Sequence, residues 1–405
     1  MNGGGTSAYG RWKRRVRFLL IELAVCLAAC EITIRIAAHF SRPLRGFMNL
    51  SYGGAMHWKR YAGATNLREL LEAAPMPYWK SCESYCGYVL NSRGLRTPEY
   101  DTVKEAGQRR IVLIGDSFLV VPSGPGDRFN ISNCLHREME RAGRTVEVID
   151  LGVEDTGPRF YLRMLELEAS RLQADCTVVF LFVGNDLTDE AVEAGFLTFG
   201  ETLRSWSQTL RFFHAAGELA TKVPLTSLSS WVSPLVPARF QRGGFYRGGG
   251  CWTDEVPTFT EEAWFDIQRT RSAVFEEPWA PAIQLQWQAM TGIIARMKEV
   301  AEAGNSPFLL VLIPDATQVS IPLQSRIREA KPAVRMDFDR PQRELREFCN
   351  RHGIATIDLL PAFRAASSRG IPVYRFQDTH WNSCGQALAA RAIAPVIRRI
   401  ASRYR

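Results

Sequence analysis

The apolar residues of this 405-residue chain follow two repeating patterns, which predict alternating strands and helices. Short runs rich in Val, Ile, Leu and Phe are typical of buried strands, whereas apolar residues three and four positions apart indicate amphipathic helices. The predicted strands cover residues 111–115, 146–152, 177–184, 307–314 and 354–360. The clearest predicted helices cover residues 160–172, 284–303, 340–352 and 385–402. This alternation favours a parallel sheet covered on both faces, in a doubly wound α/β domain with right-handed crossovers.

The first forty residues have a pattern of their own. The basic run RWKRRVR at 11–17 precedes an apolar segment at 18–40, an order typical of a signal anchor. Glu22, Glu31 and Arg35 interrupt the apolar segment, so its most hydrophobic part is short for a spanning helix. The positive-inside rule predicts a single-pass protein of the bacterial inner membrane, with the chain after about residue 40 outside the cytoplasm.

Two alternatives remain open for this N-terminal segment. The small-residue pattern LAAC at 27–30 resembles a lipoprotein processing site, which predicts anchoring at Cys30. In the second alternative, the segment is a buried amphipathic helix of a cytoplasmic protein. If the domain is exported, Cys82 and Cys86 are close enough in sequence to be a disulfide candidate.

The sequence divides into three parts. Residues 1–40 form the predicted anchor, residues 41–106 a linker and N-terminal extension, and residues 107–405 the α/β domain. An insertion at about 196–283 interrupts the α/β domain, because it is rich in Trp, Phe, Pro and Gly and has no convincing strand–helix alternation. Four of its aromatic residues are Trp206, Trp231, Trp252 and Trp264. They either line a cleft for a sugar or a lipid, or they pack the insertion onto the domain, and we favour the second interpretation.

Composition and charge exclude some classes of protein. With 46% hydrophobic and 23% charged residues, the chain has an ordinary globular composition and is not expected to be disordered. The formal net charge of +8 is spread along the chain, apart from residues 11–17 and 398–405. Because no nucleic-acid-binding motif accompanies this charge, we expect no nucleic-acid partner. No Cys and His cluster has the spacing of a zinc site, so we expect no metal.

A candidate nucleophile follows the first predicted strand. IVLIGDSF at 111–118 places Gly115, Asp116 and Ser117 where the strand ends and a loop begins. Open parallel sheets bind ligands beyond the carboxyl ends of their strands, so Ser117 lies where a substrate is expected, with Asp116 as a supporting residue. By itself, this short string is equally consistent with a turn and a helix cap.

A candidate base and its acid lie near the C-terminus. Asp378 precedes His380 by two residues, in a loop before the last predicted helix. A catalytic serine needs a base to take its proton, and the base needs a carboxylate to fix its tautomer and stabilise the imidazolium. These two residues supply both groups if their loop folds over the sheet edge that carries Ser117.

Candidate oxyanion donors come from three neighbouring strand ends. Gly152 ends the second predicted strand, and Asn185 follows the third. The N–H groups of Ser117 and Gly152 and the side-chain amide of Asn185 are suitable donors for the oxyanion that develops during acyl transfer. Taken alone, Asn185 is more simply explained as a cap or a turn residue.

Together these segments resemble the ordered sequence blocks of the SGNH hydrolase superfamily. The blocks are IVLIGDSF, the glycine of IDLGV, FVGND and DTHWN, with Ser117, Gly152, Asn185 and His380 in the four name-giving positions. The resemblance covers roughly residues 90–190 and 300–400. It implies a three-layer flavodoxin-like fold with a parallel five-stranded sheet and a serine-dependent reaction that needs no cofactor.

The acid stands two residues before the histidine, where three is commoner in this superfamily. The DTHW sequence is similar to the alginate-type polysaccharide O-acetyltransferases. From the SGNH-like blocks and the predicted export, we predict a serine esterase. We expect it to hydrolyse O-acyl esters, chiefly acetyl, on glycans of the cell envelope or outside the cell. A polysaccharide O-acetyltransferase with the same triad and a non-catalytic, envelope-binding SGNH-like protein remain the alternatives.

Overall fold

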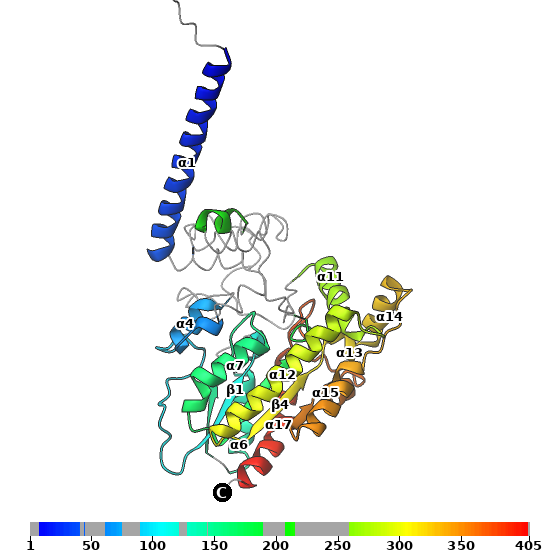
Figure 1. Cartoon of the computed structure of the whole chain (residues 1–405). Coiled ribbons are helices and arrows are strands. Elements are labelled where there is room, and N and C mark those ends of the chain that lie inside the picture. Colours follow the sequence, from blue (N-terminus) through cyan, green and yellow to red (C-terminus); the bar gives the residue numbers. More distant parts are fainter. Residues whose placement is uncertain are drawn as a thin grey trace, which may run out of the picture.

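The computed structural model describes residues 8–40, 44, 61–74, 90–120, 128–143, 145–188, 207–214 and 259–403 (Figure 1). Its centre is a five-stranded parallel sheet made of β1 (Arg109–Ile114), β2 (Val146–Asp150), β3 (Cys176–Phe182), β4 (Phe308–Ile313) and β5 (Ala355–Asp358). The five strands that the apolar runs predict are therefore confirmed, with ends that differ by at most two residues.

The strand order is β2-β1-β3-β4-β5, which is the flavodoxin-like order. The chain moves from β1 outward to β2 on one side and then returns to add β3, β4 and β5 on the other. The switch point between β1 and β3 is where such sheets bind ligands, beyond the carboxyl ends of the strands. The predicted fold class is confirmed.

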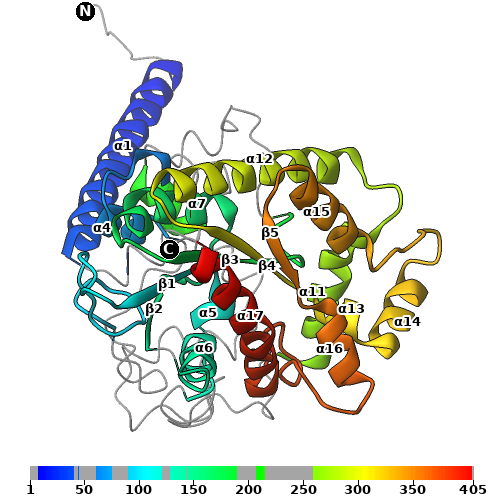
Figure 2. The same cartoon turned by 90° about the horizontal axis from the view of Figure 1, so that it is seen from below.

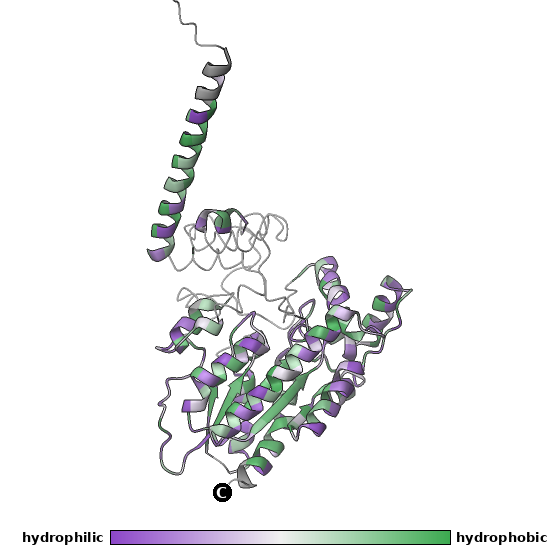
Figure 3. Ribbon diagram, in the orientation of Figure 1, coloured by the Kyte–Doolittle hydropathy of each residue, from purple (hydrophilic) through white to green (hydrophobic). Residues whose placement is uncertain are grey.

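Alternating side chains of the strands form two separate apolar clusters, one on each face of the sheet. On β1, Val112 and Ile114 belong to one cluster, and Ile111 and Leu113 belong to the other. All residues of β3 and β4 are buried, as expected for central strands covered on both faces. Figure 3 shows the same arrangement as a hydrophobic sheet between helices whose outer faces are hydrophilic.

Helices cover both faces of the sheet, which makes three layers (Figure 2). One face packs against α7 (Pro158–Leu167), α12 (Pro281–Ala303) and α15 (Arg340–Arg351). The other packs against α6 (Ile131–Glu140), α16 (Leu360–Ser367) and α17 (Ser383–Arg403). The shorter helices are α4 (Leu67–Ala73), α5 (Ser117–Val120), η3 (Ala169–Arg171), α13 (Ala316–Val319) and α14 (Ile321–Ala330).

Two of the predicted helices differ from the structure by more than two residues at one end. The segment predicted as one helix at 160–172 is α7 followed by the 3₁₀ turn η3. Helix α12 begins at Pro281 rather than at residue 284, because proline at the first helical position needs no N–H partner.

The insertion is helical where the structure describes it near its end. It contains α11 (Glu261–Arg271) and η6 (Ser272–Phe275), which the hydrophobic pattern does not indicate. Thr260 caps α11 by accepting a hydrogen bond from the Ala263 N–H. Trp206, Trp231 and Trp252, and the cysteine pair at 82 and 86, lie outside the described residues.

The N-terminal segment forms the long helix α1 (Ala8–Phe40). Its Glu31 carboxylate accepts hydrogen bonds from the Ser207 hydroxyl and from the backbone N–H groups of Gln208 and Thr209. These are the first N–H groups of a short helix at 208–214, so the insertion is tied to α1. Across the described ranges, we find no helix with both the length and the apolar character that a membrane crossing requires.

Candidate active site

Ser117 lies at the carboxyl edge of the sheet, directly after β1. The strand ends at Ile114, and Ser117 is the first residue of the short helix α5. The buried Asp116 side chain accepts a hydrogen bond of 3.0 Å from the Phe118 N–H, which fixes the turn. The Asp116 carboxylate therefore holds the backbone that carries the serine.

Gly152 allows α5 to lie against the end of β2. A Cβ atom at this position would lie 2.5 Å from the Leu119 Cβ, a distance that packed side chains do not tolerate. The backbone beyond β2 also continues the ladder, since the Val153 N–H donates to the Gly115 carbonyl at 3.0 Å. A residue larger than glycine here would push away the helix that begins with Ser117.

His380 and Asp378 come to the same edge from the loop before α17. The His380 Nε2 lies 2.8 Å from the Ser117 Oγ, and its Nδ1 lies 2.7 Å from the Asp378 Oδ1. The same Asp378 oxygen accepts the His380 backbone N–H at 2.9 Å. The structure thus joins the serine, the histidine and the aspartate in one hydrogen-bonded chain, in the order that nucleophilic catalysis requires.

Burial differs along this chain. The Asp378 side chain is fully buried, whereas 19% of the His380 side chain is exposed. A buried carboxylate orients the imidazole without competition from water, and a partly exposed imidazole can exchange protons with a substrate. Exposure therefore increases along the chain of hydrogen bonds, from the fully buried Asp378 to the partly exposed His380 and Ser117.

Trp381 fixes the histidine loop onto the core. Its side chain is completely buried, and its indole N–H donates to the Phe118 carbonyl at 2.9 Å. The Phe118 ring lies between the two, 5.1 Å from the His380 ring and 5.4 Å from the Trp381 ring. The residue after Ser117 and the residue after His380 are thus hydrogen-bonded to each other, which couples the two segments that carry Ser117 and His380.

The end of the insertion also holds the acid loop. The Trp264 indole N–H, on α11, donates to the Asp378 carbonyl at 3.1 Å. The Phe259 N–H donates to the Gln377 carbonyl at 3.2 Å, and Gln377 has a positive φ of 45°. Sequence reasoning included Trp264 among lid-packing aromatics but missed this contact, because no local pattern links positions 264 and 378.

Gly152 and Asn185, the two other expected oxyanion donors, follow β2 and β3 and lie in different environments. The buried Asp186 carboxylate holds the turn that carries Asn185, since it accepts from the Phe182 N–H at 2.8 Å and from the Tyr161 hydroxyl at 3.1 Å. The Gly152 N–H, in contrast, donates to the Asp150 Oδ1 at 2.9 Å. The main role of Gly152 is therefore to allow close packing. Its N–H can donate to an oxyanion only if the Asp150 carboxylate shares that N–H.

Glu154 is an acid near His380 that sequence reasoning missed. It follows β2 by a few residues, in the segment that begins with Gly152. Burial raises the pKa of the Glu154 carboxyl, while the nearby His380 and Arg96 oppose that rise. A second carboxyl group therefore lies within electrostatic range of His380, and only tertiary structure reveals it.

A parallel α/β sheet with a bonded serine, histidine and aspartate at its carboxyl edge defines an enzyme of the esterase or acyltransferase type. Residues 277–403 match the family model described as "SGNH hydrolase-like domain, acetyltransferase AlgX". This C-terminal part of the chain is therefore similar to the SGNH hydrolase superfamily. The matched segment contains Asp378 and His380, whereas Ser117, Gly152 and Asn185 lie before it.

The solved structures that this chain resembles are distant in sequence and have low TM-scores. A putative acylhydrolase from Bacteroides fragilis is 11% identical, with a TM-score of 0.36 over 73% of this chain and 90% of that one. A lipase/acylhydrolase from Enterococcus faecalis is 14% identical, with a TM-score of 0.33 over 73% and 96%. The acetyl xylan esterase AlAXEase is 12% identical, with a TM-score of 0.35 over 71% and 98%. No curated protein matches the sequence.

Proposed function

We propose that this protein is a serine esterase that removes O-acyl groups, chiefly acetyl, from glycans of the cell envelope or outside the cell. The observation that carries the proposal is the 2.8 Å contact between the Ser117 Oγ and the His380 Nε2. A serine hydroxyl is a weak nucleophile by itself, and a base at this distance is what makes it reactive. The acetyl preference follows the description of the matching family.

In the proposed mechanism, His380 accepts the Ser117 proton while the Ser117 oxygen attacks the ester carbonyl carbon. The Ser117 N–H and the Asn185 amide donate to the oxyanion, with Gly152 as a third donor that Asp150 must share. The imidazolium then protonates the leaving sugar oxygen, which gives an acyl-enzyme. Water attacks this intermediate with His380 as base, and the carboxylic acid and the serine are released.

Ester hydrolysis by the full chain tests this proposal. Nitrophenyl acetate, longer nitrophenyl esters and an acetylated glycan are offered to the wild type, Ser117→Ala and His380→Ala. We expect the wild type to prefer acetyl and both variants to lose activity by at least about 10³-fold. Ser325→Ala, at an exposed serine on α14, is the matched control and should retain full activity. Turnover that survives Ser117→Ala would refute the nucleophile.

A second candidate function is acetyl transfer to a polysaccharide. The matching family model is described as an acetyltransferase, and the DTHW sequence that carries Asp378 and His380 resembles the alginate-type polysaccharide O-acetyltransferases. Transfer uses the same acyl-enzyme, with a glycan hydroxyl in place of water as the final acceptor. Incubation with an acetyl ester and an unmodified glycan separates the two, because transfer enriches the glycan in acetyl groups whereas hydrolysis releases acetate.

We also propose that the protein is exported and tethered through α1. The support is the basic run at 11–17, followed by exposed apolar side chains such as Leu19, Leu20 and Leu23. Cys30 is exposed on the same helix, so lipidation there is the alternative form of attachment. Cell fractionation of the full chain, a chain lacking residues 1–40 and Cys30→Ser distinguishes these routes. Recovery of the full chain in the cytoplasmic fraction would contradict export.

A further inference from the structure

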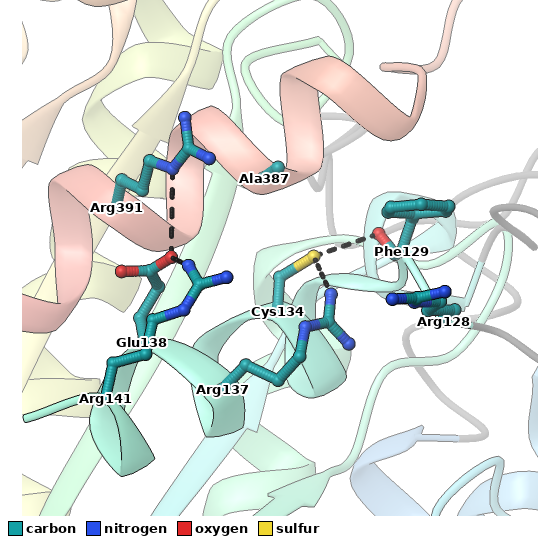
Figure 4. Close-up of a pocket in the computed structure, with 8 residues that line it drawn as sticks. All are labelled: Arg128, Phe129, Cys134, Arg137, Glu138, Arg141, Ala387 and Arg391. Atoms are coloured by element: carbon teal, nitrogen blue, oxygen red, sulfur yellow. Dashed lines mark hydrogen bonds and ion pairs between the residues drawn. The ribbon is translucent and has the colours of Figure 1, made fainter. Parts of the chain in front are cut away.

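A pocket of about 160 Å³ lies between α6 and α17, and none of the proposed catalytic residues lines it. Figure 4 shows Arg137 and Glu138 on α6, and Arg141 directly after it, facing Ala387 and Arg391 on α17, with Arg128 and Phe129 of the segment before α6 at one end. The two helices pack against each other on the same face of the sheet. The pocket is therefore a built feature of the domain that the proposed reaction does not use.

Positive charge dominates the pocket. Four arginines line it, at positions 128, 137, 141 and 391, together with one acidic residue, Glu138. The Glu138 Oε1 accepts from the Arg141 Nη1 at 2.5 Å and lies 3.7 Å from the Arg391 Nε. One carboxylate shared by two guanidinium groups leaves most of the positive charge without compensation, which is the condition for attracting an anion.

Arg137 is held in place without being neutralised. Its Nη2 donates to the Cys134 Sγ at 3.2 Å, and that thiol lies 3.4 Å from the Phe129 carbonyl oxygen. Burial raises the pKa of the Cys134 thiol, so the sulfur is uncharged at neutral pH. Within the described ranges, neither Arg128 nor Arg137 forms an ion pair with a carboxylate. The guanidinium of Arg137 is thus oriented by a neutral group and keeps its charge for a ligand.

We propose that this pocket binds a compact oxyanion, a phosphate or a carboxylate, carried by the glycan whose ester reacts at Ser117. A guanidinium group matches both anions because its N–H groups form a planar fork. Helix α17 begins three residues after His380, and Arg391 lies about 12 Å further along the helix. An extended glycan can therefore place an anionic group here while it presents an ester at the catalytic edge. The statement that the anion is carried by the glycan whose ester reacts at Ser117 rests on the proposed function.

Binding is tested in the full chain with Ser117→Ala, which removes turnover. Calorimetric titrations with inorganic phosphate, glucuronate and glucose separate the two anions from a neutral sugar of similar size. We expect saturable binding of at least one anion and none of glucose, and the anion that binds identifies the source. Arg137→Gln and Arg391→Gln should each weaken binding by about tenfold, the effect of losing one charge-assisted hydrogen bond.

Arg296→Gln is the matched control, because Arg296 is an exposed arginine on α12 that pairs with Glu299 on the other face of the sheet. It should leave the affinity unchanged. If Arg137→Gln lowers the unfolding temperature, Arg391→Gln still decides, since the Arg391 side chain is 65% exposed and its replacement disturbs no core packing. The inference is wrong if neither anion binds saturably, or if Arg296→Gln weakens binding as much as the pocket variants.

Kinetics of the otherwise unmodified chain test the link to Ser117. For an acetylated oligosaccharide that carries the anion that binds, Arg391→Gln should raise KM about tenfold and leave kcat unchanged. For a neutral acetylated oligosaccharide, both constants should stay as in the wild type. Anion binding without any ester cleavage would refute the proposed function and leave the pocket as an anion site. Ester cleavage without anion binding would refute the pocket alone.

Discussion

The two edges of the central sheet use polar groups in opposite ways. At the amino edge, where β1 and β3 begin, the Asp175 carboxylate accepts from the Lys104 Nζ at 2.7 Å, the Arg109 Nη1 at 2.9 Å and the Arg110 N–H at 2.8 Å. At the carboxyl edge, the polar chain through Asp378 and His380 ends at the partly exposed hydroxyl of Ser117. At the amino edge, the polar groups bond to one another. At the carboxyl edge, the hydrogen-bonded chain ends at a side chain that is partly exposed.

The comparison shows how geometry distinguishes polar groups that stabilise the fold from polar groups that are available for function. A carboxylate surrounded by its own partners contributes to stability and has no capacity left for a ligand. A chain of groups that ends at an exposed nucleophile gains little stability and supports chemistry instead. Substitutions at the carboxyl edge should therefore reduce activity more than stability, and substitutions at the amino edge should do the opposite.

The largest effect is expected for His380→Ala. Loss of the base should lower kcat for acetyl ester hydrolysis by at least about 10³-fold, while the unfolding temperature changes little because the imidazole is partly exposed. His352→Ala, at the exposed end of α15, is the control and should leave both values unchanged. Equal losses of activity in the two variants would mean that the carboxyl edge is not the reactive one.

Gly152→Ala should combine a large activity loss with a measurable stability loss. The added Cβ would lie 2.5 Å from the Leu119 Cβ, so α5 must move, and Ser117 with it. We expect kcat to fall about 10²- to 10³-fold and the free energy of unfolding to fall by about 1–3 kcal/mol. Gly292→Ala in α12 is the control, since an added Cβ there meets nothing within 4 Å. Stability should rise slightly in that control.

Trp264→Phe should have a smaller and more specific effect. The variant keeps an aromatic ring but loses the N–H that donates to the Asp378 carbonyl. We expect kcat to fall about tenfold. The loss follows because a displaced Asp378 carboxylate orients the His380 imidazole less well. Trp287→Phe, on α12, serves as control, and the assignment fails if the two variants have the same kcat.

The smallest effect on activity is expected for Asp175→Asn at the amino edge. Burial opposes ionisation of Asp175, but the hydrogen bonds from Lys104, Arg110 and Arg109 outweigh it and lower the pKa of this carboxyl. The stabilisation is therefore present above the ordinary pKa of about 4 and is lost as the pH falls through the lowered value. Denaturant titrations should show a loss of about 1–2 kcal/mol at pH 7 that shrinks toward pH 3, with kcat unchanged. A loss that is independent of pH would contradict the ionic assignment.

The strands and the nucleophile turn could be predicted because their causes are local. The apolar run of β1 and the small residues after it are sufficient to place Ser117 at a strand end. The same holds for Asn185 after β3, since parallel strands deliver their carboxyl ends to one edge. The helix at 261–271 was not predicted, because few of its residues are buried and its apolar periodicity is weak.

The contacts that hold the acid loop could not be predicted because they join distant positions. Trp264 reaches Asp378 across 114 residues, and Trp381 reaches Phe118 across 263 residues. The raised pKa of Glu154 likewise depends on burial by other segments. The local sequence DTHW indicated which residues matter, and tertiary packing decides how they are held.

Labelling with a fluorophosphonate tests the central claim most directly. The full chain is treated at neutral pH, and the modified residue is located by mass spectrometry. The account predicts a single adduct on Ser117 that is lost in His380→Ala, because the hydroxyl reacts only when the imidazole takes its proton. An adduct on another residue, or labelling of Ser117 at the same rate without His380, would contradict it.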